Sequence, residues 1–169
     1  MIGETGFVKF ELHTEPDLKV LAFRVRGLIN RMEDMRPLLT GFGELFKGAM
    51  SLQFATEGRY GSGGWAALSP AYAKWKAEHF PGRPIGVLHG FLRSGMTGGA
   101  GYSQHILRQS ADYGLGAGPA VEYGKYFDAG GRGPARPVIR FGAGESAKWR
   151  RFTETWAHES ARASGWGAS

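Results

Sequence analysis

A chain of 169 residues fits a single domain, because one core is usually built from about 100 to 200 residues. Hydrophobic residues make up 42% and aromatic residues 13%, enough for a packed core, and the 28 glycines predict many turns around it. The absence of cysteine excludes disulfides, thiolate metal sites and cysteine nucleophiles.

The net charge of +6 is unevenly distributed along the chain. Residues 1–60 carry eight basic and eight acidic groups, whereas residues 130–169 carry seven basic and three acidic groups. This excess favours a nucleic acid or an acidic protein surface as a neighbour, although solubility alone also explains it. No apolar run approaches the roughly 20 residues of a membrane span, and the N-terminus lacks the pattern of a signal peptide. We therefore expect a soluble, unprocessed protein with no membrane contact.

The first predicted elements are a short strand and an amphipathic helix. Residues 7–12 (FVKFEL) are compatible with a strand. Residues 14–17 (TEPD) supply a capping threonine, a proline suited to a first turn and acidic groups that favour a helix N-terminus. Apolar residues then recur at spacings of three and four, which places them on one helical stripe. They are Leu18, Leu21, Ala22, Val25, Leu28, Ile29 and Met32. We expect this stripe to be core or a packing seam.

A second helix is predicted from Pro37, because proline suits a first helical turn and disfavours helix in the residue before it. Its apolar positions again keep helical spacing and run to Leu52. Gly41, Gly43 and Gly48 interrupt it, each at a cost of up to ~1 kcal/mol relative to alanine. Such glycines are expected to allow close helix packing or a bend.

The rest of the chain is predicted to contain shorter elements separated by glycine and proline. They are a loop at 61–64, a helix over 71–80 with Ser69-Pro70 as its N-cap and first turn, a helical turn within 86–96, strands at 102–109 and 112–118, a last strand at 138–141, and a terminal helix from Glu145 to about Ala163. Helices at both ends with a small, mostly antiparallel sheet between them indicate an α+β fold. We expect one domain over 1–169, with a strand and helical hairpin in 1–58, a loop, helix and sheet region in 59–142, and a helix and tail in 143–169.

No local motif supports catalysis, a cofactor or a metal. The five histidines are scattered, without the i, i+4 spacing of a helical zinc site. Gly114–Pro119 superficially resembles a dinucleotide loop, but a proline follows its last glycine and its third glycine is misplaced, so it is better explained as a turn. Ser69 is better explained as a helix cap than as a nucleophile, and Glu33 and Asp34 point in different directions at a helix end. We expect a protein that is not an enzyme and that uses no cofactor and no metal, while an active site without a local signature stays an open alternative.

Aromatic and arginine side chains are the best candidates for binding, because Trp, Tyr and Arg are over-represented at protein interfaces. The alternatives are simple core packing for the aromatic residues and a solvated loop for the arginines, which could also bind phosphate or acidic side chains. The candidate interface residues are Trp65, Tyr72, Trp75, Arg93, Tyr123, Tyr126, Arg132 and Arg136.

Several short segments between residues 54 and 141 follow one another in a recognisable order. They are Phe54, Gly58 and Trp65; Leu68-Ser69-Pro70, Tyr72 and Lys76; Leu88, Gly90, Leu92-Arg93 and Ser94; Gly116, Gly118, Tyr123 and Gly130; and Pro134-Ala135-Arg136-Pro137. This succession resembles the phage virion morphogenesis or tail completion family, with its relatives among the neck and tail-terminator proteins of tailed phages. His89, Gly124 and Phe127-Asp128 depart from the residues usual in that family.

The resemblance implies a structural virion protein that forms a ring, hexameric in the family, at the head–tail junction or the head-proximal end of the tail. Its implied partners are copies of itself, the tail-tube protein and head-side connector or stopper proteins. Assembly in the host bacterial cytoplasm and a place in the virion follow from the same resemblance. The basic C-terminal groups could then face genomic DNA in the lumen or an acidic partner ring.

Glycine-rich loops can order on assembly, so we expect residues 61–64 to form a flexible arm with Trp65 as its anchor on a neighbouring subunit. The main alternative is a DNA-binding or DNA-processing protein that uses the C-terminal basic surface. A hydrolase is the least supported reading, because the sequence offers no catalytic set.

Overall fold

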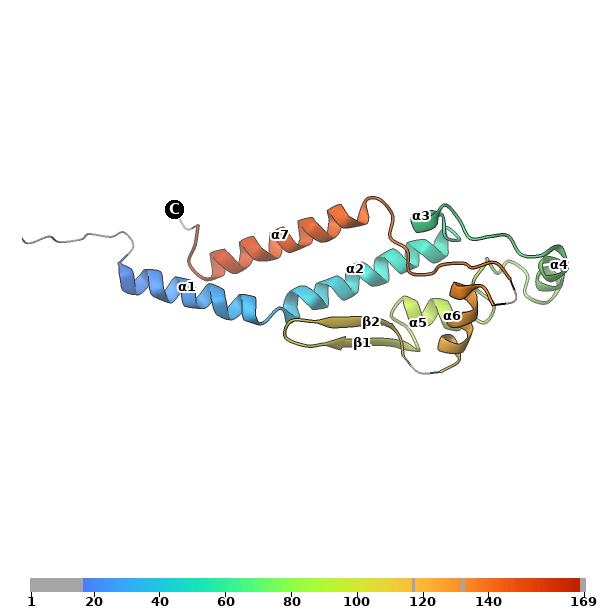
Figure 1. Cartoon of the computed structure of the whole chain (residues 1–169), viewed down its shortest axis with the longest axis horizontal. Helices are drawn as coiled ribbons and strands as arrows, with labels where there is room; N and C mark the ends of the chain where they lie inside the picture. Colours follow the sequence, from blue (N-terminus) through green and yellow to red (C-terminus); the bar gives the residue numbers. More distant parts are fainter. Residues whose placement is uncertain (1–16, 117, 132, 168–169) are drawn as a thin grey trace, which may run out of the picture.

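The fold is organised around one long helix, α2 (Arg36–Ala55), which runs through the middle of an elongated molecule (Figure 1). The computed structural model describes residues 17–116, 118–131 and 133–167. Pro37 lies in the first turn of α2, as predicted, where its missing N–H costs no hydrogen bond. Leu38, Phe46, Met50 and Phe54 lie on its buried face at helical spacing and form the centre of the core.

Helix α7 (Glu145–Ala163) packs along α2 and confirms the predicted terminal helix. Gly41 makes the close approach possible, because a Cβ at this position would overlap the ring of Phe152 on α7. Gly43 has a similar role beside the sheet, where an added Cβ would lie 3.1 Å from the ring of Tyr113. Gly48 has open space around it, so close packing explains only two of the three glycines.

Helix α1 (Leu18–Glu33) continues beyond the N-terminal end of α2 and extends away from the core (Figure 1). The carboxylate of Asp17 caps it by accepting a hydrogen bond from the backbone N–H of Lys19 at 3.0 Å. None of its residues is buried. Among the described residues, its main contact with another helix is with α7, and Gly27 lies beside Ser164, which follows that helix.

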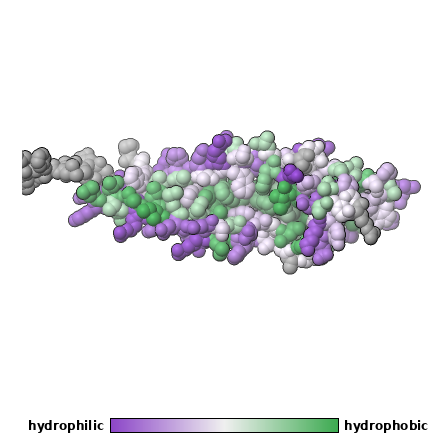
Figure 2. Space-filling model, viewed as in Figure 1, coloured by the Kyte–Doolittle hydropathy of each residue, from purple (hydrophilic) through white to green (hydrophobic). Residues whose placement is uncertain are grey.

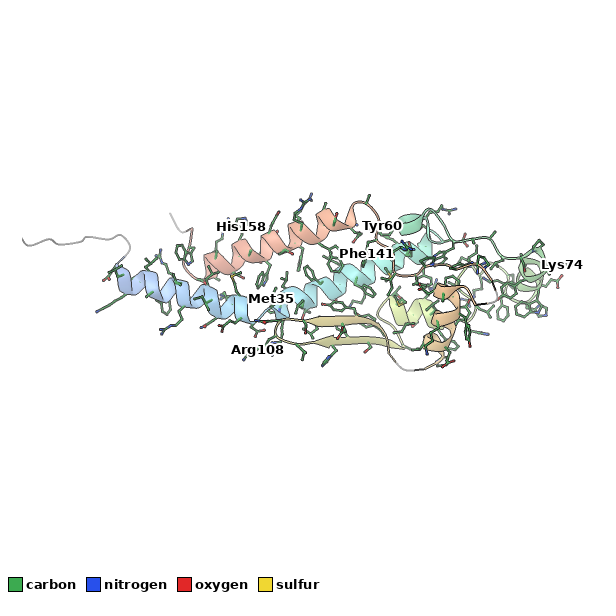
Figure 3. All side chains as sticks on the ribbon, viewed as in Figure 1. Met35, Tyr60, Lys74, Arg108, Phe141 and His158 are labelled. Atoms are coloured by element: carbon green, nitrogen blue, oxygen red, sulfur yellow. The ribbon has the colours of Figure 1, made fainter. Side chains whose placement is uncertain are left out.

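The sheet is one antiparallel hairpin of β1 (Tyr102–Ile106) and β2 (Ala111–Leu115). The predicted hairpin is therefore confirmed, but both strands are shorter than expected because residues 107–110 form the turn. The carbonyl of Arg108 in this turn accepts a hydrogen bond of 2.8 Å from the N–H of Met35, so the turn lies at the junction of α1 and α2 (Figure 3).

The predicted strand at 138–141 is wrong. The backbone groups that a strand would pair are hydrogen-bonded to side chains instead. The carbonyl of Pro137 accepts hydrogen bonds from the side chains of Gln53 and Trp65. The N–H of Val138 donates to the side chain of Asp128 at 2.8 Å. The N–H of Arg140 turns back to the carbonyl of Val138. The segment therefore forms no ladder with the hairpin. The strand expected at 7–12 lies outside the described residues.

Four shorter helices complete the end of the molecule opposite α1: α3 (Arg59–Ser62), α4 (Pro70–His79), α5 (Phe91–Met96) and α6 (Pro119–Ala129). The predicted helix after Ser69 is confirmed, and the hydroxyl of Ser69 accepts the N–H of Tyr72 as a cap. The sequence analysis assigned no element to 119–129, although Pro119 at the start and Gly130 at the end, with φ of +94°, are ordinary helix limits. The α+β class is confirmed, and no described helix is both long and apolar enough to cross a membrane.

Candidate interaction surfaces

Trp65 lies inside the core of the chain and is only 7% exposed. Its ring makes edge contacts with Phe54 at 5.3 Å and Phe127 at 5.0 Å between centroids. Its Nε1–H donates a hydrogen bond of 2.9 Å to the carbonyl of Pro137. The prediction that Trp65 anchors the chain on a neighbouring subunit is therefore wrong, and the core alternative holds.

Residues 61–64 do not form a projecting arm. Gly61 belongs to the short helix α3, and its N–H donates a hydrogen bond of 2.9 Å to the side-chain carbonyl of Gln53. A Cβ at Gly61 would overlap the backbone of Arg140, so this turn packs tightly on the chain. Glycine permits the close approach at Gly61 and the left-handed conformation of Gly63 and Gly64.

Arg136 is committed to the backbone of its own chain. Its Nε–H donates to the carbonyl of Ala66 at 2.7 Å and its Nη2 donates to the carbonyl of Ala67 at 2.9 Å. The guanidinium also lies 5.8 Å from the ring centre of Phe127. Arg136 therefore fixes the loop before α4, while Arg132, the other candidate in this segment, lies outside the described residues.

The structure brings several predicted interface residues together in one cleft of about 520 Å³ between α4 and α6. Tyr72, Tyr123, Tyr126 and Arg136 all line it. Burial raises the pKa of Tyr123 above its ordinary value. We call this the aromatic cleft. Arg93 is exposed on α5 and is not among the residues that line it.

A row of stacked rings continues from the aromatic cleft along α4. Trp75, 40% exposed, stacks on Tyr72 at 5.4 Å and on His79 at 5.0 Å. His79 is fixed in place by a 2.8 Å hydrogen bond between its Nδ1 and the carbonyl of Trp75. These rings lie at the tip of the molecule, where Lys74 is labelled in Figure 3. The aromatic residues are therefore presented in a fixed geometry on an exposed helix, as interface anchors usually are.

The second surface is the apolar stripe of α1, which the sequence analysis expected to be core or a packing seam. Leu18 is 58% exposed and Met32 is 55% exposed, with Val25 and Ile29 between them at 40% and 49%. Figure 2 shows hydrophobic residues gathered at this end of the molecule. Gly27 and Arg24 lie beside Ser164 and Gly165, which follow α7, and Leu21 and Leu28 of the stripe are half-buried. Leu18, Val25, Ile29 and Met32 are the part of the stripe that stays exposed within the described part of the chain.

The third surface is a larger cleft of about 940 Å³ where β2, α6 and residues 135–140 converge. Its walls include apolar side chains from four segments, and Lys125, Asp112 and Arg140 add charges of both signs. This cleft could not be predicted from the sequence. Its lining residues come from separate segments, and no local pattern indicates that these segments lie together. We call it the β2 cleft.

A buried carboxylate joins the start of α7 to α3. Glu145, 3% exposed, accepts hydrogen bonds from the hydroxyl of Tyr60, from Nζ of Lys148 at 2.7 Å and from Nε1 of Trp149 at 3.1 Å. Burial acts to raise the pKa of Glu145, but these three hydrogen bonds outweigh it and lower the pKa below its ordinary value. Every partner stabilises the ionised form, so the arrangement holds a structural anion rather than a proton donor.

No protein-family model, no curated protein and no solved structure matches this chain.

The three surfaces present groups that are suited to contact with other proteins. Among the residues that the structure describes, no cluster of three or more histidine, aspartate or glutamate side chains is placed to hold a metal ion. The aromatic cleft, the α1 stripe and the β2 cleft instead present apolar and aromatic groups with a few fixed polar ones. Such surfaces are typical of protein interfaces.

Proposed function

We propose that this protein is a structural subunit of a tailed-phage virion, which assembles with copies of itself into a ring at the head–tail junction or the head-proximal end of the tail and helps to join tail to head. The exposed stripe of α1 is the observation that carries this proposal. A soluble chain that leaves such a stripe uncovered is expected to bury it against a partner.

The stripe has the spacing of a helix-packing seam. Leu18, Val25 and Met32 are seven residues apart, and apolar pairs at 21–22 and 28–29 fall between them. Apolar residues at such positions form the seam along which one helix packs on another. Burial of these exposed side chains would stabilise a contact by about 25 cal/mol for each square ångström of apolar surface, which favours association.

The placement of the surfaces supports a head-to-tail arrangement. The α1 stripe and the aromatic cleft lie at opposite ends of the elongated chain (Figure 1), so one copy cannot use one to cover the other. Contacts between two different patches on successive copies close into rings when the rotation between copies allows it. A ring of this kind therefore requires two different contact surfaces on each subunit.

The residues that carry the family resemblance support the proposal in another way, because they come together in space. Phe54 packs on Trp65, Gly58 leaves room for that indole, and Arg136 and Pro137 bind the segment around it. These residues form one structural unit, and Arg136 connects it to the aromatic cleft, which it lines together with Tyr72.

Mass measurements test the proposal. Multi-angle light scattering of the purified protein, alone and with a tail-tube protein, should give a closed oligomer or a capped tube. Leu18→Glu combined with Ile29→Glu should give a monomer that still folds, because both side chains are exposed. Phe23→Glu is the matched control, since Phe23 is also apolar and is 77% exposed on α1 but lies off the stripe. A wild-type chain that stays monomeric under all these conditions would contradict the proposal.

A further inference from the structure

β2 has a free edge. Among the described residues it pairs only with β1, and no backbone hydrogen bond joins 111–115 to any other segment. The bonds from Gly116 to Gly101 and from Leu107 to Ser110 fix which residue pairs exchange hydrogen bonds across the hairpin. The N–H and C=O groups of Ala111, Tyr113 and Leu115 therefore point outward, away from β1. Such an edge is a template for another extended segment.

The free edge borders the β2 cleft. On the other side of the cleft lie residues 137–140, which form no ladder, and Ile139 there is 54% exposed. The floor between them is apolar and includes Leu92, Met96 and Val138. The cleft is thus a slot with a hydrogen-bonding edge, an apolar floor and charged groups among the residues that line it.

One segment of this chain has the composition that the slot would accept. Residues 7–12 (FVKFEL) are predicted to be extended and lie outside the described part. In a strand, Val8, Phe10 and Leu12 would share one face, and Phe7, Lys9 and Glu11 would share the other. Six extended residues span about 20 Å, close to the length of the five-residue β2.

The segment cannot occupy the slot of its own chain as a whole. Leu12 is six residues from the start of α1, a reach of about 20 Å, whereas α1 itself is about 24 Å long. α1 leads away from the hairpin, whose turn lies at the junction of α1 and α2 (Figures 1 and 3). Even a fully extended return along α1 would leave Leu12 short of that junction. Full occupation of the slot by residues 7–12 therefore needs a second copy of the chain.

From these observations we infer that residues 7–12 of one copy add as a strand to the free edge of β2 in the next copy and fill its β2 cleft. The inference rests on the proposed self-assembly and names one of its contacts. The α1 stripe and the strand ahead of it then act as one continuous arm that reaches over the neighbour. The exchange is directional, since a donor segment meets a different acceptor site, as ring closure needs.

The absence of cysteine makes the test direct, because every crosslink comes from an introduced pair. Full-length Phe10→Cys and full-length Ile139→Cys are purified separately, mixed, allowed to exchange subunits and oxidised. A disulfide-linked dimer containing one chain of each kind is expected. Asp112→Cys, on the opposite wall of the cleft, is a second acceptor whose exposed position protects folding. Leu52→Cys, exposed on α2, is the matched control and should give no dimer with Phe10→Cys.

The outcomes separate this inference from the proposed function. A wild-type-sized oligomer in which neither acceptor crosslinks above the Leu52→Cys control would overturn the strand exchange and leave ring assembly standing. A Phe10→Cys, Ile139→Cys double variant that closes within one chain at high dilution would also overturn it. If the wild-type chain never forms an oligomer, the proposed function fails and the strand exchange fails with it.

Discussion

The indole Nε1–H of Trp65 donates a hydrogen bond of 2.9 Å to the carbonyl oxygen of Pro137, a residue 72 positions further along the chain. Two further bonds, from the guanidinium of Arg136 to Ala66 and Ala67, fasten the same two segments side by side. The loop before α4 and the proline-rich segment after α6 therefore behave as one piece. Their mutual contacts explain why both segments need their particular residues.

Trp65→Ala should destabilise the folded chain strongly. The substitution removes the edge contacts with Phe54 and Phe127, leaves a cavity and removes a donor from Pro137, for a loss of about 3–5 kcal/mol in the free energy of unfolding. Chemical denaturation monitored by circular dichroism measures the loss. Trp75→Ala is the control, because its half-exposed ring should cost much less. Equal losses for the two variants would show that Trp65 is not the centre of the core.

The sequence could predict the long helices, since α2 and α7 carry apolar residues at helical spacing and begin at good start signals such as Pro37. It could not decide whether Trp65 was core or interface. A tryptophan beside a glycine-rich loop fits both, and the choice depends on Phe127 and Pro137, which are more than 60 residues away in the chain. Local composition favoured a strand at 138–141, but the N–H of Val138 donates to the side chain of Asp128 and is not available to a neighbouring strand.

Gly41→Ala and Gly48→Ala should have opposite effects, although both replace a glycine in the same helix. At Gly41 the new methyl group would overlap the ring of Phe152 and force α2 and α7 apart, at a cost of about 1–3 kcal/mol. At Gly48 the methyl group meets open space, so the higher helix propensity of alanine should add up to about 1 kcal/mol. Thermal unfolding of the two variants measures both changes in stability. Destabilisation by Gly48→Ala would contradict the open space around Gly48.

The acid stability of the protein should depend on Glu145. Its pKa is lowered in the folded state, so the unfolded chain takes up the proton first as the pH falls. The carboxylate therefore contributes stability above its ordinary pKa of about 4.5, and this contribution is lost as the pH drops through the folded value. Unfolding measured between about pH 7 and pH 3 should show this loss in the wild type.

Glu145→Gln should reduce stability at neutral pH by about 1.5–3 kcal/mol, because a charged acceptor of three hydrogen bonds is lost. It should also flatten the pH dependence, since the titrating group is gone. Glu154→Gln, exposed on the same helix, controls for the change in net charge. If stability falls as steeply with acid in Glu145→Gln as in the wild type, another titrating group causes the loss.

The residue types of the candidate site could be predicted from the sequence, but the shape of the cleft could not. Tyr72, Trp75, Tyr123 and Tyr126 were expected at an interface because of their chemistry, and the structure places them at or beside one cleft. Their convergence depends on α6, which brings Tyr123 and Tyr126 against α4 and which the sequence analysis did not assign. The β2 cleft left no signal at all, because a free strand edge is a property of the sheet and not of the residues in it.

Association of this protein should depend little on salt if the α1 stripe holds it together. Apolar contacts are not screened by ions, whereas a complex driven by phosphate contacts weakens by orders of magnitude between roughly 50 and 200 mM salt when six or more phosphates are bound. The oligomer mass should therefore stay constant over this range, and any binding to duplex DNA, measured by fluorescence anisotropy, should be weak and lost with salt.

Arg136 is already bonded to Ala66 and Ala67, so one of the basic groups on which a DNA-binding surface would depend is occupied. Tight, salt-sensitive DNA binding by a chain that remains monomeric, reduced by Arg150→Ala with Arg151→Ala on exposed positions of α7, would instead favour a DNA-binding protein.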